Sequence, residues 1–195
     1  MFVRKREKWS SAMNEIDQFV HLMISNGISW ASTQRDTHRP NAHALRDEDR
    51  EAMKSFFSPE TLDEVRLHFV PIIENPDFFA EFEMAGQPIS LDFRMMQGIT
   101  FVDTILISKE MRDPAEGRWL PLLFHELVHV VQYKVLGLEE FMRRYVTGWA
   151  ENGRQYAKIP LEVQAYTLQE HFETAPGLPF DIEDRVRKEL GVGAP

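Results

Sequence analysis

The sequence predicts an α+β fold, with strands in the middle of the chain and helices at both ends. The best strand pattern lies within residues 98–107, a nearly all-apolar helix pattern covers 119–136, and amphipathic patterns occupy both ends. A length of 195 residues suits one domain with a buried core. We expect a single domain, in which residues 1–45 are an N-terminal helical arm or part of the core, residues 46–112 are helices plus a sheet, and residues 113–195 are helical.

The first half of the chain alternates helices and loops before the strands begin. Ser11 starts an amphipathic helix that we expect to stop at Asn26-Gly27. Residues 31–50 are typical of a loop leading into a charged helix near 46–56. A short helix opens at Ser58-Pro59-Glu60, because proline suits a first helical turn. The segment 65–70 is expected to be a strand.

The second half begins with an ambiguous stretch, residues 74–97, which fits a short helix or a strand. Residues 98–107 form the best strand candidate, rich in β-branched side chains and bounded by Gly98. A long helix over 119–136 should stop at Gly137. Three further helices are expected over 138–150, 161–174 (ended by Pro176-Gly177) and 181–190.

Composition excludes several function classes. Acidic residues outnumber basic ones 31 to 22, giving a net charge of −9, and a nucleic-acid binder needs a basic footprint. The chain contains no cysteine, which excludes disulfides, thiolate zinc sites and cysteine nucleophiles. No apolar run is long enough to span a membrane, and no signal core follows the basic start. The default compartment is the cytoplasm, and the oligomeric state stays open.

The apolar helix over residues 122–133 carries an unusual polar group, His125, Glu126, His129 and Gln132. Residues four apart in a helix lie about 40° apart around its axis, so both imidazoles can reach one ion. Glu126 projects from the flank of the same face. This is the His-Glu-x-x-His arrangement of zinc hydrolases, which use one Zn²⁺ ion. Histidines satisfied by hydrogen bonds inside the core are the alternative, but a metal explains all three residues together. Gln132 either orients a ligand or simply bonds within the core.

A catalytic zinc normally takes three protein ligands. Gln at position 132 and Val at position 135 exclude the longer three-histidine pattern of metzincins. Glu162 is the preferred third ligand, since it starts an amphipathic helix with small Ala165 one turn later. Glu151, near a helix end, and His171, in the same helix as Glu162, stay open as alternatives.

Because it contains His125, Glu126, His129 and Glu162, the chain resembles a gluzincin, a zinc metallopeptidase that uses two histidines and a distal glutamate. More narrowly, His125 through Tyr133 followed by Pro160-Leu161-Glu162 is similar to small bacterial metallopeptidases with a HELxHVVQ helix. The resemblance covers roughly residues 45–170. It implies a zincin-like fold with a small sheet on a buried zinc helix, residues 113–195 forming the zinc-binding part. It also implies His125, His129 and Glu162 as ligands, with Glu126 as general base.

One position departs from the best-known gluzincins. They often place an aspartate four residues after the ligand glutamate, as a partner of a zinc histidine, and this chain has Tyr166 there. Partners of this kind orient the ligands and tune the metal. The departure therefore bears on activity more than on metal binding.

The expected mechanism is attack of a zinc-activated water on a carbonyl, with Glu126 moving the proton. A further donor is needed for the oxyanion, and Tyr156 and Tyr166 are the better candidates among the four tyrosines. The strand near residues 99–107 could pair with an extended peptide substrate.

Three functions are compatible with these sequence features. The first is a zinc-dependent peptidase acting on a protein or peptide. The second is a metal-binding scaffold or interaction module that has lost turnover. The third is a zinc hydrolase of small amides. Intact Glu126 favours an enzyme, because retention of a metal alone does not require it.

Overall fold

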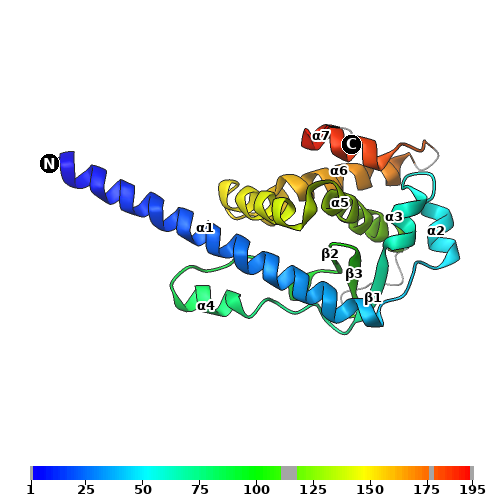
Figure 1. Cartoon of the computed structure of the whole chain (residues 1–195), viewed down its shortest axis with the longest axis horizontal. Coiled ribbons are helices and arrows are strands. Elements are labelled where there is room, and N and C mark those ends of the chain that lie inside the picture. Colours follow the sequence, from blue (N-terminus) through cyan, green and yellow to red (C-terminus); the bar gives the residue numbers. More distant parts are fainter. Residues whose placement is uncertain (1, 111–117, 176–177, 194–195) are drawn as a thin grey trace.

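The computed structural model describes residues 2–110, 118–175 and 178–193, with side chains from Asp17 onward. Within these residues the fold is α+β, as the sequence predicted (Figure 1). The elements in chain order are α1 (Phe2–His38), α2 (Asp47–Met53), α3 (Pro59–Glu64), β1 (Arg66–Val70), α4 (Phe78–Met84), β2 (Gly98–Phe101), β3 (Thr104–Ser108), α5 (Trp119–Glu151), α6 (Pro160–Thr174) and α7 (Ile182–Leu190). The proposed boundary at 112–113 and the predicted stop at Pro176-Gly177 lie outside the described residues.

The three strands form one mixed sheet in the order β1-β3-β2. Strand β3 lies in the centre, parallel to β1 and antiparallel to β2, with Ile105 facing both Leu67 and Thr100 in the register. Every residue of β3 is buried. The expected single strand over 98–107 was therefore wrong, because the chain reverses at Val102-Asp103 to make a hairpin.

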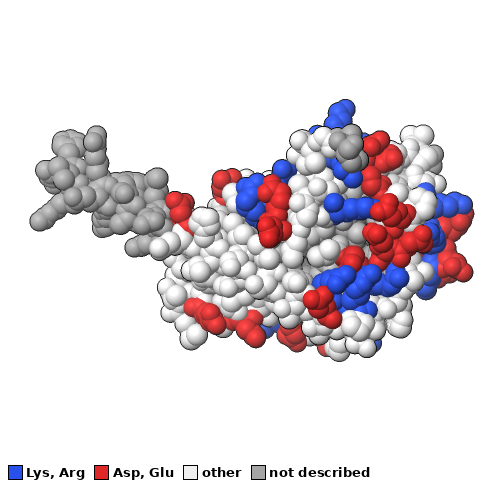
Figure 2. Space-filling view, viewed as in Figure 1, with Lys and Arg blue, Asp and Glu red and all other residues white. Residues whose placement is uncertain are grey.

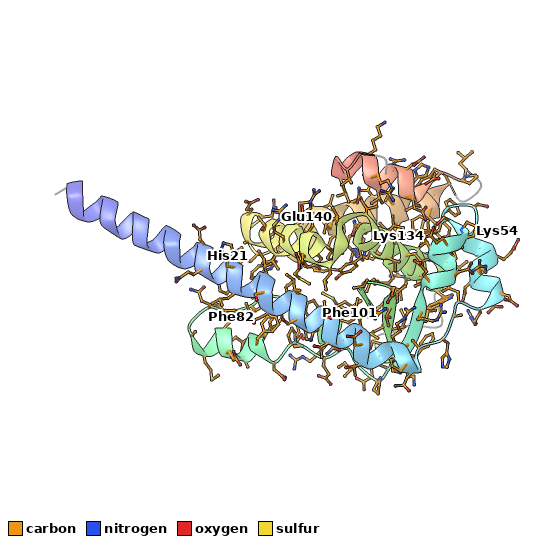
Figure 3. The ribbon with its side chains drawn as sticks, viewed as in Figure 1. His21, Lys54, Phe82, Phe101, Lys134 and Glu140 are labelled. Carbon is orange, nitrogen blue, oxygen red and sulfur yellow. The ribbon has the colours of Figure 1, made fainter. Side chains whose placement is uncertain are left out.

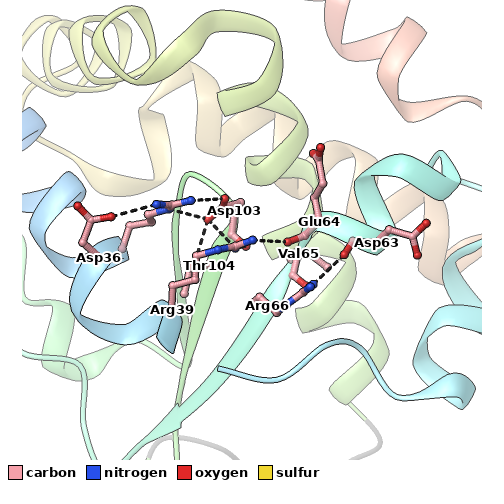
Figure 4. A network of polar contacts seen from close by, with 9 residues as sticks. Asp36, Arg39, Asp63, Glu64, Val65, Arg66, Asp103 and Thr104 are labelled. Carbon is pink, nitrogen blue, oxygen red and sulfur yellow. Dashed lines mark hydrogen bonds and ion pairs between the residues drawn. The ribbon is translucent and has the colours of Figure 1, made fainter. Parts of the chain in front are cut away.

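The hairpin turn lacks the residues that usually mark one. Val102 adopts a positive φ of 61°, a conformation that glycine, asparagine and aspartate accept far more easily than a β-branched residue. Arg35 of α1 compensates by binding the Asp103 carboxylate through two nitrogens, at 3.0 and 2.9 Å. Arg39 lies 2.9 Å from the same carboxylate and also donates to the Glu64 carbonyl (Figure 4). A contact between distant segments thus holds the turn.

Helix α1 continues past the stop expected at Asn26-Gly27 and through much of the predicted 31–50 loop. Gly27 is a packing residue: a Cβ added there would lie 2.8 Å from Sδ of Met142 in α5. Ala31, one turn later, is fully buried. Two small residues thus let α1 lie against α5, so the glycine permits a close helix crossing and does not end the helix.

Most of the other predicted helices agree with the structure. Helix α2 matches the charged helix expected near 46–56, and α3 begins at Pro59 with Ser58 capping Thr61. The ambiguous 74–97 stretch contains α4. Gly137 interrupts α5 with φ 75° and ψ 162°, so the helix has two segments that meet at the predicted stop. Gly191, with φ 68°, ends α7.

Helix α5 runs between two groups of buried residues. Phe124 and Leu127, in its first segment, belong to the group that includes β3 and α7. Trp149, in its second segment, belongs to the group that includes α1 and β2. Because both segments contribute buried residues to the core, α5 is the element around which the rest is arranged. Within the described part of the chain, no helix has the length and apolar character needed to cross a membrane.

Charged side chains are unevenly spread over the surface. On the face drawn in Figure 2, Lys and Arg intermingle with Asp and Glu over the end that holds α2, α3 and α7. The part between α1 and α4 is mostly uncharged on this face. Charges of both signs are therefore interspersed on this face.

Replacing Asp103 with asparagine should destabilise the protein by about 1–3 kcal/mol, because two arginines lose a charged acceptor. Burial opposes ionisation, but Arg35 outweighs it and lowers the pKa of Asp103 below 3.8, its ordinary value. A group with a lowered pKa stabilises the fold above its ordinary pKa and loses this effect in acid. Urea unfolding at pH 7 and near pH 3 should therefore show a smaller difference between the two proteins at pH 3.

Asp36→Asn is the matched control. Asp36 also binds Arg35, at 3.0 Å, but its side chain is 66% exposed. We expect little change in unfolding free energy, as for most surface ion pairs. An equal loss in both variants would contradict the special role of the turn.

Candidate metal centre

The two histidines of α5 lie on one face of the helix, one turn apart. His125 and His129 are both buried, within an unbroken buried run from Leu123 to Tyr133. Their Nε2 atoms approach to 3.1 Å. The helical spacing therefore brings both imidazoles to the same point, as the sequence predicted.

Glu162 reaches this point from α6. Pro160 begins the helix, and Glu162 in its first turn is only 2% exposed. Its Oε2 atom lies 3.3 Å from Nε2 of His125 and 3.5 Å from Nε2 of His129. The structure thus brings Glu162 to the histidines. It leaves the two alternatives elsewhere, since Glu151 is exposed and His171 stacks on Phe180 at 4.4 Å.

The geometry of these three residues fits a metal ion. Oε2 of Glu162 is buried and has no hydrogen-bond partner among the described residues. One ligand atom from each residue lies within 4.8 Å of the others. A tetrahedral zinc with bonds of about 2.0–2.1 Å separates its ligands by about 3.3 Å. The observed separations of 3.1, 3.3 and 3.5 Å match this value. The group could therefore hold an ion, and its geometry does not decide which metal.

The tautomer of His129 is set by a glutamine. Nδ1 of His129 lies 2.8 Å from Oε1 of Gln132, whose Nε2 donates to the Leu161 carbonyl at 2.9 Å. A carbonyl only accepts, so the amide orientation is fixed and its oxygen must face the imidazole. Nδ1 therefore donates, and the Nε2 lone pair points toward Glu162. This is the arrangement found behind metal-bound histidines.

His125 has a similar partner. Its Nδ1 lies 3.1 Å from Oε1 of Gln169, whose Nε2 donates to Glu173 at 2.6 Å. The Gln132 amide likewise donates to Gln164, which in turn donates to Glu189 of α7. An amide three residues after position 166 thus faces the imidazole of His125. The ring of Tyr166 instead lies against His125, with centroids 4.5 Å apart.

Strong electrostatic coupling joins the three central residues. Burial alone would raise the pKa of Glu162, but the charge of His129 outweighs it and holds that pKa far below its usual range. Burial would likewise lower the pKa of His129, but the charge of Glu162 raises it to about 9. His129 thus carries a proton that separates its Nε2 atom from the Glu162 carboxylate. A cation in that place would relieve the same repulsion.

Glu126 lies beside the group without belonging to it. Thr100 of β2 donates to its Oε2 at 2.7 Å. Gly98 faces the other carboxylate oxygen, since a Cβ there would lie 2.6 Å from Oε1. Burial is the main cause that raises the pKa of Glu126 above its ordinary value. The sheet edge therefore positions this carboxylate, a role for Thr100 and Gly98 that sequence reasoning missed.

Three tyrosines lie around the group. Tyr145, which was not favoured, donates to Oε1 of Glu162 at 2.7 Å. Tyr156, in the short 3-10 helix Tyr156–Lys158, is half-buried near Glu162, and burial first and then the Glu162 charge raise its pKa well above the usual value. Tyr166 is 46% exposed. No helical spacing could have revealed Tyr145, because the break at Gly137 changes which face of α5 meets the site.

Zinc binding should release about one proton per ion near pH 7. His129, with a pKa raised to about 9, carries a proton at pH 7 that an incoming ion must displace. Affinity for zinc should therefore rise as pH increases toward 9 and fall in acid. Calorimetric titration in two buffers of different ionisation enthalpy counts the protons. A binding heat that is the same in both buffers would contradict this coupling.

No protein-family model, curated protein or solved structure matches this chain. The function of the centre is therefore inferred from its own geometry, and the resemblance to gluzincins stays a prediction.

Proposed function

We propose that this protein is a zinc-dependent metallopeptidase. The observation that carries the proposal is the buried group of His125, His129 and Glu162 with a second buried carboxylate, Glu126, directly beside it. A structural zinc is closed by four protein ligands, whereas a catalytic zinc has three and keeps one position for water or substrate. A purely structural site would also have no use for Glu126. The combination favours hydrolysis.

Zinc is the proposed ion because two imidazoles and one carboxylate are a common catalytic zinc set. Iron, cobalt and manganese accept the same donors. Elemental analysis of untagged protein, kept away from nickel resin, decides between them.

Each residue around the centre has a separate role in the proposed reaction. Bound zinc would polarise a carbonyl and lower the pKa of a water toward neutrality. Glu126 would accept the proton of that water and deliver it to the leaving amine, and its raised pKa favours this return. Thr100 would hold one carboxylate oxygen, so that the other carries the proton. Gln132 and Gln169 would keep the two imidazoles oriented.

The oxyanion that forms during attack needs a donor besides the ion. Tyr156 is the better positioned of the two predicted tyrosines, because it lines the same cavity as Glu126 and Glu162. Its raised pKa keeps the phenol protonated and able to donate. Tyr166 contacts His125 from the exposed side and is the second candidate.

An extended peptide could approach along β2. This strand lies at one edge of the sheet and carries Thr100, which binds Glu126. Backbone pairing with an edge strand is a common way to hold a peptide. A scaffold without turnover and a hydrolase of small amides are the competing functions.

Replacing Glu126 with glutamine should leave one zinc per chain and reduce peptide hydrolysis by about 100-fold or more, because the general base is lost. Zinc content by mass spectrometry and cleavage of a fluorogenic peptide mixture measure the two effects. Glu139→Gln, at an exposed position of the same helix, is the matched control and should change neither. A fully active Glu126→Gln protein would contradict the role of Glu126 as general base.

The same experiment separates the competing functions. A scaffold would bind zinc and show no cleavage in either protein. A hydrolase of small amides would cleave those substrates and not the peptides. Absence of zinc even after it is offered, with His129→Ala no different from the unmodified protein, would reject the metal centre itself.

Gly98→Ala should also reduce hydrolysis by about 100-fold while zinc is retained. The added Cβ would lie 2.6 Å from Oε1 of Glu126 and must displace the carboxylate, and misplacements of about 1 Å have effects of this size. Gly193→Ala, where nothing lies within 4 Å of the added carbon, should have normal rates. Normal activity in Gly98→Ala would show that the Glu126 position is not critical.

A further inference from the structure

A cavity of about 80 Å³, which opens to the solvent, extends from the candidate metal centre. Glu126, His129 and Glu162 line one end, together with the tyrosines 145 and 156. The rest of the wall comes from α1, α4, β2, α5 and the segments on either side of α4. A cavity next to a reactive centre is a natural place for a ligand, and the nature of its wall decides which ligand fits.

The wall away from the centre is apolar. Among the described residues that line the cavity there is no Lys, Arg or Asp, and both carboxylates, Glu126 and Glu162, lie at the metal end. A charged group placed further in would lose its water and find no partner, which is costly. An apolar group of similar size would gain by leaving water.

Helix α1 contributes part of this wall, through Met23, Gly27 and Trp30. The indole of Trp30 stacks on Phe93 at 5.2 Å and meets the edge of Phe101 at 4.9 Å. Phe82 of α4, labelled beside α1 in Figure 3, meets the ring of Phe19 at 5.0 Å. Aromatic contacts thus hold α1 in place. The N-terminal region therefore belongs to the site as well as to the core.

Gly27 controls how much of the cavity stays open. A Cβ at this position would lie 2.8 Å from Sδ of Met142, and both residues line the cavity. The thioether of Met142 is flexible and would have to move. Any larger residue at position 27 would therefore add its own bulk to the cavity or push Met142 into it.

We propose that this cavity binds an apolar group attached to the carbonyl that is hydrolysed, and that Gly27 and Met142 set the size it accepts. The inference rests on the proposed function, since the metal end would hold the carbonyl. The group could be the side chain of an apolar residue in a peptide or the hydrocarbon of an acyl amide. Both groups are apolar and would make the same kind of contact with this wall.

Four hydroxamic acids test the proposal on the full-length, zinc-loaded protein. Each binds zinc through the same head group, and the tails are methyl, phenylethyl, heptyl and carboxyethyl. Calorimetry should show the phenylethyl and heptyl compounds binding about tenfold or more tighter than the methyl compound, through burial of the tail. The carboxyethyl compound should bind no better than the methyl compound. The stronger of the two apolar tails indicates whether a side chain or an acyl chain is the natural group.

Gly27→Leu should remove most of the difference in affinity between the apolar tails and the methyl compound. Ser29→Leu adds the same bulk at an exposed position of α1 and should keep the preference. Because the four-compound comparison is made on the unmodified protein, the test stands even if Gly27→Leu fails to fold.

The failures are distinguishable. Equal affinities for all four compounds would overturn the apolar-cavity proposal and leave the metal centre intact. No zinc-dependent binding of any compound would overturn the proposed function and this inference with it. A preference that Gly27→Leu leaves unchanged would overturn the role of Gly27.

Discussion

The structure depends on one electrostatic constraint, the pairing of Glu162 with His125 and His129 inside an apolar environment. A buried carboxylate or imidazole without partners costs several kcal/mol. Here the three side chains face one another with lone pairs directed at a common point, at 3.1–3.5 Å. Each satisfies the others only if a proton or a cation sits between them. The packing of α6 on α5 is therefore tied to the state of this group.

The surrounding residues are arranged to keep that point rigid. Amides stand behind both imidazoles, and each amide is itself held, by the Leu161 carbonyl and Gln164 on one side and by Glu173 on the other. Such outer partners fix ring orientation and tautomer. Through Gln164 and Glu189, the same series of hydrogen bonds links α7 to the centre. Amide side chains from two different helices thus orient both imidazoles.

The sheet and the N-terminal helix complete the site from the other side. Strand β2 supplies Thr100 to the Glu126 carboxylate, and the hairpin that contains β2 is held by Arg35 of α1 and by Arg39, which follows that helix directly. The same helix lines the apolar cavity through Trp30. One element therefore braces the turn, the sheet edge and the cavity wall. The proposed hydrolysis of a carbonyl compound with an apolar group requires the turn, the sheet edge and the cavity wall to keep these relative positions.

The sequence by itself determined the α+β order of elements and the shared face of His125 and His129, because helical spacing is a local property of the chain. It also favoured Glu162 from its place at the start of a helix. Only the tertiary structure decided the partners that come from elsewhere. The break at Gly137 turns Tyr145 toward Glu162, and the reversal at Val102 brings Thr100 to Glu126. These contacts depend on how separate elements pack against one another, so no local pattern encodes them.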